Sequence, residues 1–179
     1  MARNFMCTKT DPVVETKAGK LRGFQLDGTY AFHGVKYADA KRFHQPTPVE
    51  PWEGIKNALA YGYVCPMLQQ DQPSNELMVP HRYWPLDENC QYLNIWTQHL
   101  DPNAKKPVLV WLHGGGFAAG SSIEHIAYEG ENMSKYGDVV VISLNHRLNI
   151  LGYLDLSPFG EEYKLSLIHI SEPTRPISI

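Results

Sequence analysis

The segment of this chain best suited to chemistry is the run His-Gly-Gly-Gly-Phe at residues 113–117. It directly follows the apolar segment 107–112, so the glycines lie where a buried strand ends in a loop. Backbone amides that no side chain covers can bind a negatively charged oxygen. A turn without chemistry is the alternative. A phosphate-binding loop would need Gly-Lys-Ser/Thr or G-x-G-x-x-G spacing, and the sequence has neither at this position.

Two apolar segments and the stretch between them define the elements that must position this run. Residues 107–112 and 138–144 are predicted strands, and residues 124–136 are predicted to form a weakly amphipathic helix that ends at Gly137. Two apolar strands joined by a helical crossover indicate a parallel βαβ unit in a sheet buried on both faces. Ligands of such sheets bind beyond the carboxyl ends of the strands, where the glycine run lies.

The N-terminal third of the sequence has the pattern of an antiparallel meander. Asp27-Gly28 is a hairpin turn signal between predicted strands at residues 21–24 and 30–32. Alternating polarity predicts a further strand at residues 90–96. A meander followed by a parallel βαβ unit indicates an α/β fold.

Composition and charge restrict the class of protein. The chain has 179 residues, of which 43% are hydrophobic and 20% charged, as expected for one globular domain. A net charge of −3 gives no electrostatic reason to expect a nucleic acid or an anionic membrane as partner. The first residues lack the apolar core of a signal peptide and no apolar run is long enough to cross a membrane, so we expect a cytoplasmic protein.

The cysteines and histidines do not form a metal-binding pattern. Cys7, Cys65 and Cys90 show no C-x-x-C spacing, and the eight histidines are scattered without H-E-x-x-H or paired spacing. We therefore expect no metal and no cofactor. In a reducing compartment all three cysteines should be thiols.

Four separated segments follow the order and spacing of one known family. They are residues 33–38 (HGVKYA), 88–95 (ENCQYLNI), 110–117 (VWLHGGGF) and 137–154, which contains GDVVV and NHRLNILGYL. In this order the chain resembles the type-B carboxylesterases, the family of cholinesterases and bacterial para-nitrobenzyl esterases. The resemblance covers residues 13 to 163 and implies the N-terminal part of an α/β-hydrolase fold with an incomplete sheet.

The resemblance also implies roles for residues of the glycine run. The backbone N–H groups of Gly115 and Gly116 would form part of an oxyanion hole, the third donor being the residue after the catalytic serine. His113 and Gly114 would support the loop, and Phe117 would either pack in the core or line the acyl pocket. The members of the family's first disulfide pair correspond to Cys65 and Cys90, although we expect thiols here.

Four positions depart from the family pattern. Lys36 replaces a proline, Asn89 an aspartate, Gln91 a leucine and His146 a tyrosine. None of these changes touches the backbone amides of the glycine run. They leave the substrate preference open.

The nucleophile that an oxyanion hole would serve is missing from the sequence. Ester hydrolysis by this route needs a serine in G-x-S-x-G, a histidine base and an orienting acid. No serine has that context; the serines are Ser74, Ser121, Ser122, Ser134, Ser143, Ser157, Ser166, Ser171 and Ser178. We therefore expect the N-terminal part of a serine carboxylesterase whose complete form acts on a small-molecule ester through an acyl-enzyme. The alternative is a catalytically inactive, cholinesterase-like binding module.

The C-terminal residues do not follow the family pattern. Residues 165–175 (LSLIHISEPTR) resemble the translation of a transposase-type sequencing-library adaptor; the alternative is a divergent natural tail. We expect an N-terminal extension over residues 1–12, a truncated esterase domain over 13–164 and a non-native tail over 165–179. Truncation there should leave the strand at 138–144 with an unpaired apolar edge, and the chain poorly soluble and inactive.

Overall fold

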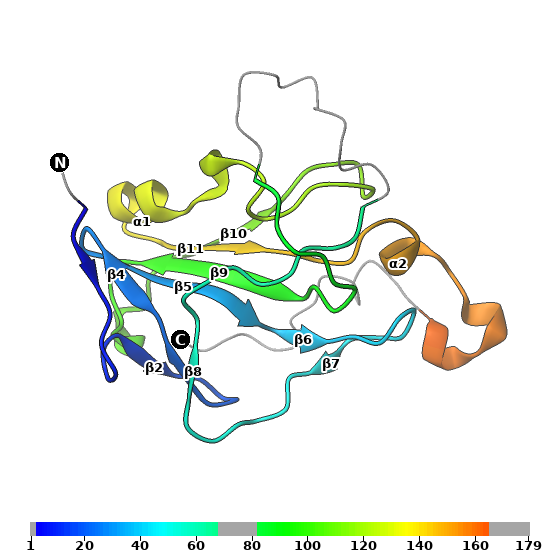
Figure 1. The fold of residues 1–179 in the computed structure, drawn as a ribbon, viewed down its shortest axis with the longest axis horizontal. Coiled ribbons are helices and arrows are strands. Elements are labelled where there is room, and N and C mark those ends of the chain that lie inside the picture. Colours follow the sequence, from blue (N-terminus) through cyan, green and yellow to red (C-terminus); the bar gives the residue numbers. More distant parts are fainter. Residues whose placement is uncertain (1–2, 68–81, 165–179) are drawn as a thin grey trace.

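A mixed six-stranded sheet forms the centre of the molecule. The structure, a computed structural model, describes residues 3–67 and 82–164, so the expected tail at 165–179 lies outside the described residues (Figure 1). The strands follow the order β1-β4-β5-β9-β11-β10. Their bounds are β1 (Phe5–Met6), β4 (Phe24–Leu26), β5 (Thr29–Lys36), β9 (Tyr92–Thr97), β10 (Val108–Leu112) and β11 (Val140–Leu144).

Smaller elements cover the two faces of this sheet. A second sheet contains β2 (Val13–Glu15), β3 (Lys20–Arg22) and β8 (Ile55–Asn57), and a third pairs β6 (Ala38–Asp39) with β7 (Thr47–Pro48). The helices are α1 (Glu131–Gly137) and α2 (Asn149–Tyr153), with 3-10 turns η1 (Pro102–Ala104), η2 (Ile126–Tyr128), η3 (Ser157–Phe159) and η4 (Glu161–Tyr163). Helix α1 covers one face and the second sheet the other (Figure 1).

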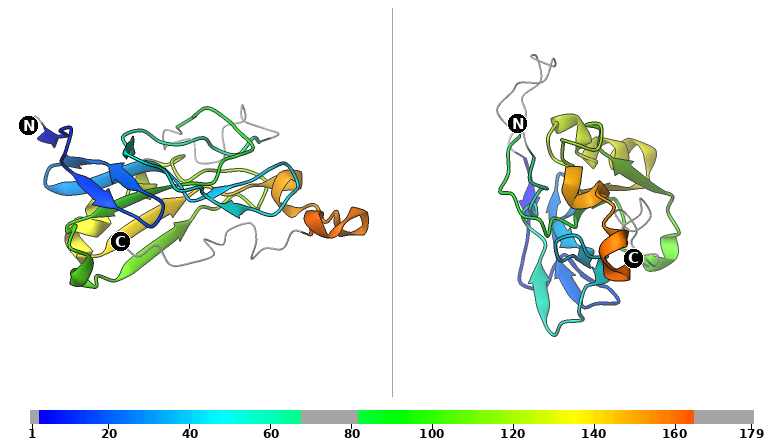
Figure 2. Two further views of the ribbon diagram at one scale, coloured as in Figure 1. Left: turned by 90° about the horizontal axis from the view of Figure 1, so that it is seen from below. Right: turned by 90° about the vertical axis from the view of Figure 1, so that its right-hand side faces the viewer.

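Helix α2 and the turns after it project from one end of the molecule, beside the β6–β7 hairpin (Figure 2). No helix within residues 3–67 and 82–164 has the length and apolar character needed to cross a membrane. The expected N-terminal extension, residues 1–12, contributes β1, which pairs antiparallel with β4.

The predicted hairpin is present, but the predicted strand at residues 21–24 is divided. β4 and β5 pair antiparallel around Asp27-Gly28, as expected. Gly23 separates β3 in the second sheet from β4 in the main sheet. A Cβ at Gly23 would lie 2.3 Å from the carbonyl oxygen of Ala31, so the backbone passes directly against β5 there. The alternation of polar and apolar residues does not indicate that the chain passes from one sheet to another at this point.

The predicted βαβ unit is confirmed, but the helix in its crossover connection is shorter than predicted. β10 and β11 pair in parallel from Val108 opposite Val140 to Leu112 opposite Leu144. The prediction of one helix over residues 124–136 is wrong, because the segment forms η2 and then α1. Gly130 lies between the two, and a Cβ there would lie 2.6 Å from Val141. The backbone at Gly130 therefore packs directly on the sheet instead of continuing a helix.

Strand β10 forms one edge of the six-stranded sheet as described, and β1 forms the other. β11 lies between β9 and β10 and pairs with both, so the expected open edge at residues 138–144 is wrong. The expectation that both apolar strands are buried on both faces is also wrong for β10. Its residues Val108, Val110 and Leu112 are 58%, 52% and 56% exposed. Apolar composition predicts a strand inside a sheet, whereas its position in the sheet depends on pairing between distant segments.

Two of the buried clusters among the described residues lie on the two faces of the main sheet, and a third contains Cys65, Cys90, Leu148 and Leu151. Phe32, Ile95 and Ile142 stand opposite one another on β5, β9 and β11 and centre the larger cluster. Trp96 and Val141 belong to the cluster under α1. Strand β9 is buried along both faces, because the second sheet packs on one face of it and α1 on the other, so its sequence alternation does not produce an exposed face.

His33 on β5 gives the fold a predicted acid sensitivity. Its ring stacks on Tyr61 at 4.4 Å and meets the rings of Phe24 and Trp96 edge-on, and its buried Nε2 has no hydrogen-bond partner among the described residues. Burial lowers the pKa of His33 to about 4, with Glu129 raising it and Arg82 lowering it. The unfolded state therefore binds more protons, and stability is lost as pH falls from about 6.5 towards 4.

We expect His33→Phe to remove this loss, which amounts to up to about 3 kcal/mol between pH 7 and pH 4. Urea unfolding of the wild-type chain and the variant at several pH values measures the difference. Parallel pH profiles for the two chains would contradict the prediction.

Candidate active site

The glycine run lies at the carboxyl end of β10, next to the segment that follows β11. Because β10 and β11 are parallel, residues 113–117 and residues 145–149 leave the sheet at the same edge. The N–H of Asn149 donates a hydrogen bond to the carbonyl oxygen of Phe117 at 2.7 Å. The structure thus joins two segments that are about thirty residues apart in sequence.

The backbone of the run adopts a turn that requires glycine. Gly115 and Gly116 have φ of +126° and +62°. The amides of Ala118 and Ala119 both donate to the carbonyl oxygen of Gly115, at 3.1 Å. A Cβ at Gly115 would lie 1.9 Å from the carbonyl oxygen of Ala119. No other residue fits at position 115 without a change in the turn.

Gly115 and Gly116 are exposed residues on the surface of this turn. Neither N–H donates a hydrogen bond to any group in residues 3–67 or 82–164. Two adjacent free backbone donors can stabilise the negative oxygen of a tetrahedral intermediate. The expected oxyanion role of these two residues stays a prediction that this geometry permits.

Phe117 occupies a conformation that is uncommon for a bulky residue. Its φ is +64°, in the left-handed region. The hydrogen bond from Asn149 and a ring contact with Tyr153, at 4.9 Å between centroids, hold it there. The side chain is 62% exposed, so Phe117 is no core residue of the described structure. Strained residues of this kind gather at functional sites.

His113 closes the base of the run. Its Nδ1 lies 2.9 Å from the carbonyl oxygen of Gly114, and its buried ring stacks on that of His146. Burial lowers the pKa of both histidines, so both rings are neutral at pH 7. The contact of His146 with the loop is not predictable from the sequence, because no local pattern relates residue 146 to residue 113.

Asn145 joins the two segments from the other side. Its Oδ1 accepts the N–H of Ser122 at 2.8 Å, and its Nδ2 donates to the carbonyl oxygen of Tyr63 at 3.0 Å. Asn145 is buried, so these bonds form away from solvent. This side chain therefore braces the loop and does not face an open site.

Cys65 and Cys90 lie together in the core as thiols. The N–H of Leu148 donates to the Sγ of Cys65 at 3.1 Å. A hydrogen bond between the two thiols lowers the pKa of Cys65 and raises that of Cys90. The expectation that both thiols stay reduced in the protein remains a prediction.

Two of the departures from the family pattern, Asn89 and Gln91, place amide side chains in a partly buried and a fully buried position. Asn89 donates to the carboxylate of Asp39 at 3.0 Å and accepts the N–H of Ala40 at 3.2 Å. Gln91 is fully buried, and neither polar atom of its side chain has a partner among the described residues. Nothing in the structure explains the glutamine.

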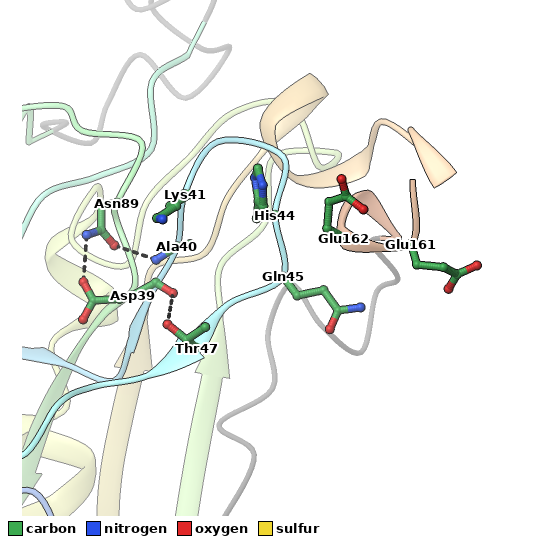
Figure 3. A pocket seen from close by; sticks show the side chains of 9 residues that line it. All are labelled: Asp39, Ala40, Lys41, His44, Gln45, Thr47, Asn89, Glu161 and Glu162. Carbon is green, nitrogen blue, oxygen red and sulfur yellow. Dashed lines mark hydrogen bonds between the residues drawn. The ribbon is translucent and has the colours of Figure 1, made fainter. Parts of the chain in front are cut away.

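A cavity of about 650 Å³ lies away from the glycine run, between the β6–β7 hairpin and η4 (Figure 3). Both acidic and basic side chains line it, among them Asp39, Lys41 and Glu162, and no residue of 113–117 does. Arg147 contacts two residues of its lining, because its Nη1 donates hydrogen bonds to the carbonyl oxygens of Lys41 and His44. Among the described residues no three His, Cys, Asp or Glu side chains form a metal site.

The strand order and the glycine loop at the carboxyl edge are those of an α/β-hydrolase. A sequence profile of the carboxylesterase family matches residues 10–161. The chain belongs to the carboxylesterase family.

Relatives of known name and structure agree with this assignment. The para-nitrobenzyl esterase of Bacillus subtilis is 37% identical over 163 residues, which are 88% of this chain and 32% of the relative. The phenmedipham hydrolase of Pseudarthrobacter oxydans is 40% identical over 150 residues, 81% of this chain and 30% of the relative. The chain thus spans about a third of the length of these proteins.

Among solved structures, an esterase from Clostridium hathewayi superposes with a TM-score of 0.85 and 66% identity. The match covers 90% of this chain and 32% of that esterase, which is described as able to hydrolyse aliphatic aromatic polyesters.

Proposed function

We propose that residues 13–164 supply the oxyanion-binding part of a type-B serine carboxylesterase that hydrolyses carboxylic esters. The observation that carries the proposal is the pair of amides at Gly115 and Gly116, which have no hydrogen-bond partner in the described part of the chain and lie on an exposed turn at the carboxyl edge of a parallel strand pair. The nucleophilic serine, its histidine base and the acid come from sequence outside these 179 residues, because no serine here has the required G-x-S-x-G context.

The two amides act on the carbonyl oxygen of the ester. When a serine oxygen attacks the carbonyl carbon, the C=O π electrons move to the carbonyl oxygen, which becomes negative. The N–H groups of Gly115 and Gly116 donate to that oxygen. The histidine base takes the serine proton and gives it to the leaving oxygen, so collapse of the intermediate breaks the ester C–O bond, expels the alcohol and leaves an acyl-enzyme. Water then releases the acid through a second intermediate with the same charge, so the two donors lower both barriers.

The relatives favour esters of aromatic compounds as substrates. The Clostridium hathewayi esterase, 66% identical over the matched region, acts on aliphatic aromatic polyesters. Para-nitrobenzyl esters appear in the name of the Bacillus subtilis relative. We infer that small aryl and benzyl esters are the first substrates to test. The intact triple glycine favours this enzyme over an inactive binding module.

A chimera tests the proposal directly. Residues 10–161 of this chain replace the matching segment of the Clostridium hathewayi esterase, which supplies the rest of the protein. We expect the chimera to hydrolyse p-nitrophenyl acetate and the 179-residue chain alone to give no rate above buffer. A folded chimera without activity, or turnover by the chain alone, would contradict the proposal.

A further inference from the structure

His113 and His146 form a buried pair of parallel rings at the base of the glycine loop. Their centroids lie 4.8 Å apart and the ring planes differ by 10°. His113 follows β10 directly, and His146 is the second residue after β11. Only 9% and 8% of these residues are exposed. The pair therefore links the ends of the two parallel strands below the loop.

The hydrogen bonds of the two rings fix where each can take up a proton. The Nδ1 of His113 lies 2.9 Å from the carbonyl oxygen of Gly114, and the Nδ1 of His146 lies 3.0 Å from that of Arg147. A carbonyl oxygen only accepts, so each Nδ1 carries a hydrogen in the neutral ring. Acid then protonates Nε2 of either ring and places a positive charge inside the stack.

His113 is in contact with both ends of the loop. Besides the bond to Gly114, its ring lies against Gly120, where a Cβ would be only 2.8 Å from Nδ1. The opposite ring belongs to the segment whose Asn145 and Asn149 bind Ser122 and Phe117. A displacement of either ring would therefore be transmitted to the loop.

Charge in this stack is unfavourable. Burial lowers the pKa of both histidines, the His146 ring further lowers that of His113, and the carbonyl oxygens of Gly114 and Arg147 oppose the shift. Glu124 is the carboxylate that faces His113 and raises its pKa, more weakly than burial lowers it. A state in which the rings separate into water therefore binds protons more readily than the stacked state.

We propose that the His113–His146 stack positions the glycine loop and releases it when acid charges the rings. His146 is a positioning residue, since it acts on Gly115 and Gly116 through His113. Only the expected consequence of this release, a loss of oxyanion binding in acid, rests on the proposed function. The release itself is a property of this chain that can be measured without any ester.

Amide hydrogen exchange of the 179-residue chain, followed by mass spectrometry from pH 7.5 to pH 5, tests the proposal. The reporters are the N–H groups of Ser122 and Asn149, whose bonds join the two segments, and Ile95 in β9 is the reference. In His146→Tyr the ring remains, but it takes up no proton in this range.

We compare the equilibrium constant for local opening at the Ser122 and Asn149 amides, after correction for intrinsic exchange. As the pH falls below about 6.5, this constant should rise more steeply in the wild type than in His146→Tyr, by up to about a factor of ten for each pH unit. Ile95 should show no such difference. His146→Phe repeats the comparison without a hydroxyl group.

Equal slopes in the wild type and both variants would overturn the proposal. So would a difference that Ile95 shares, because the histidines would then act on the whole core. An inactive chimera together with the expected exchange result would refute the esterase function and leave the positioning role intact.

Discussion

Gly115→Ala in the chimera should lower kcat/KM for p-nitrophenyl acetate by about 10²–10³, the cost of losing one oxyanion donor. The physical reason is local. Alanine at position 115 would place its Cβ 1.9 Å from the carbonyl oxygen of Ala119, at a φ of +126° that side chains rarely adopt. The turn must change, and the two amides then no longer point to one position. Initial rates with purified chimera measure the effect.

Alanine substitutions at two other glycines control for a general effect of replacing glycine by alanine on kcat/KM. Gly137→Ala, at the end of α1, meets only Val139 at ordinary contact distance and should leave kcat/KM unchanged. Gly114→Ala has nothing within 4 Å of the new Cβ and should cost much less than Gly115→Ala. Equal rates for Gly115→Ala and Gly137→Ala would show that the loop does not bind the oxyanion.

The predictable parts of the fold are those with a local signal. Asp27-Gly28 specifies a tight turn, and the apolar segments at 107–112 and 138–144 specify strands joined by a crossover, so the hairpin and the parallel pair follow from sequence. The sequence pattern contains no equivalent signal for the insertion of β11 between β9 and β10. That order depends on which distant strand each edge meets.

The candidate site divides in the same way. The glycine run is recognisable because only glycine tolerates its backbone, a property of single residues. The supports of the loop are pairs: His113 with His146, and Ser122 with Asn145. The sequence around either member of a pair does not indicate the contact. The contact follows only from the fold, in which β10 and β11 end at the same edge of the sheet.

A charge introduced on the apolar edge strand β10 should have opposite effects in the 179-residue chain and in the chimera. Val108, Val110 and Leu112 point to one face of β10 and are about half exposed, and no strand pairs with the outer edge of β10 among the described residues. An open apolar edge recruits strands from other chains. The matched relatives are about three times as long, so we expect further strands to cover this edge in the complete enzyme.

Val110→Lys should therefore raise the soluble fraction of the 179-residue chain severalfold, because a charge on an open edge opposes strand pairing between chains. In the chimera, the same substitution should destabilise by roughly 3–5 kcal/mol, the cost of a buried charge without a partner. Sedimentation of the chain and urea unfolding of the chimera give the two values. Tyr136→Lys, at an exposed position of α1, adds the same charge away from the edge and is the control. If Val110→Lys behaves like Tyr136→Lys in both proteins, β10 is neither the site of self-association nor an internal strand of the enzyme.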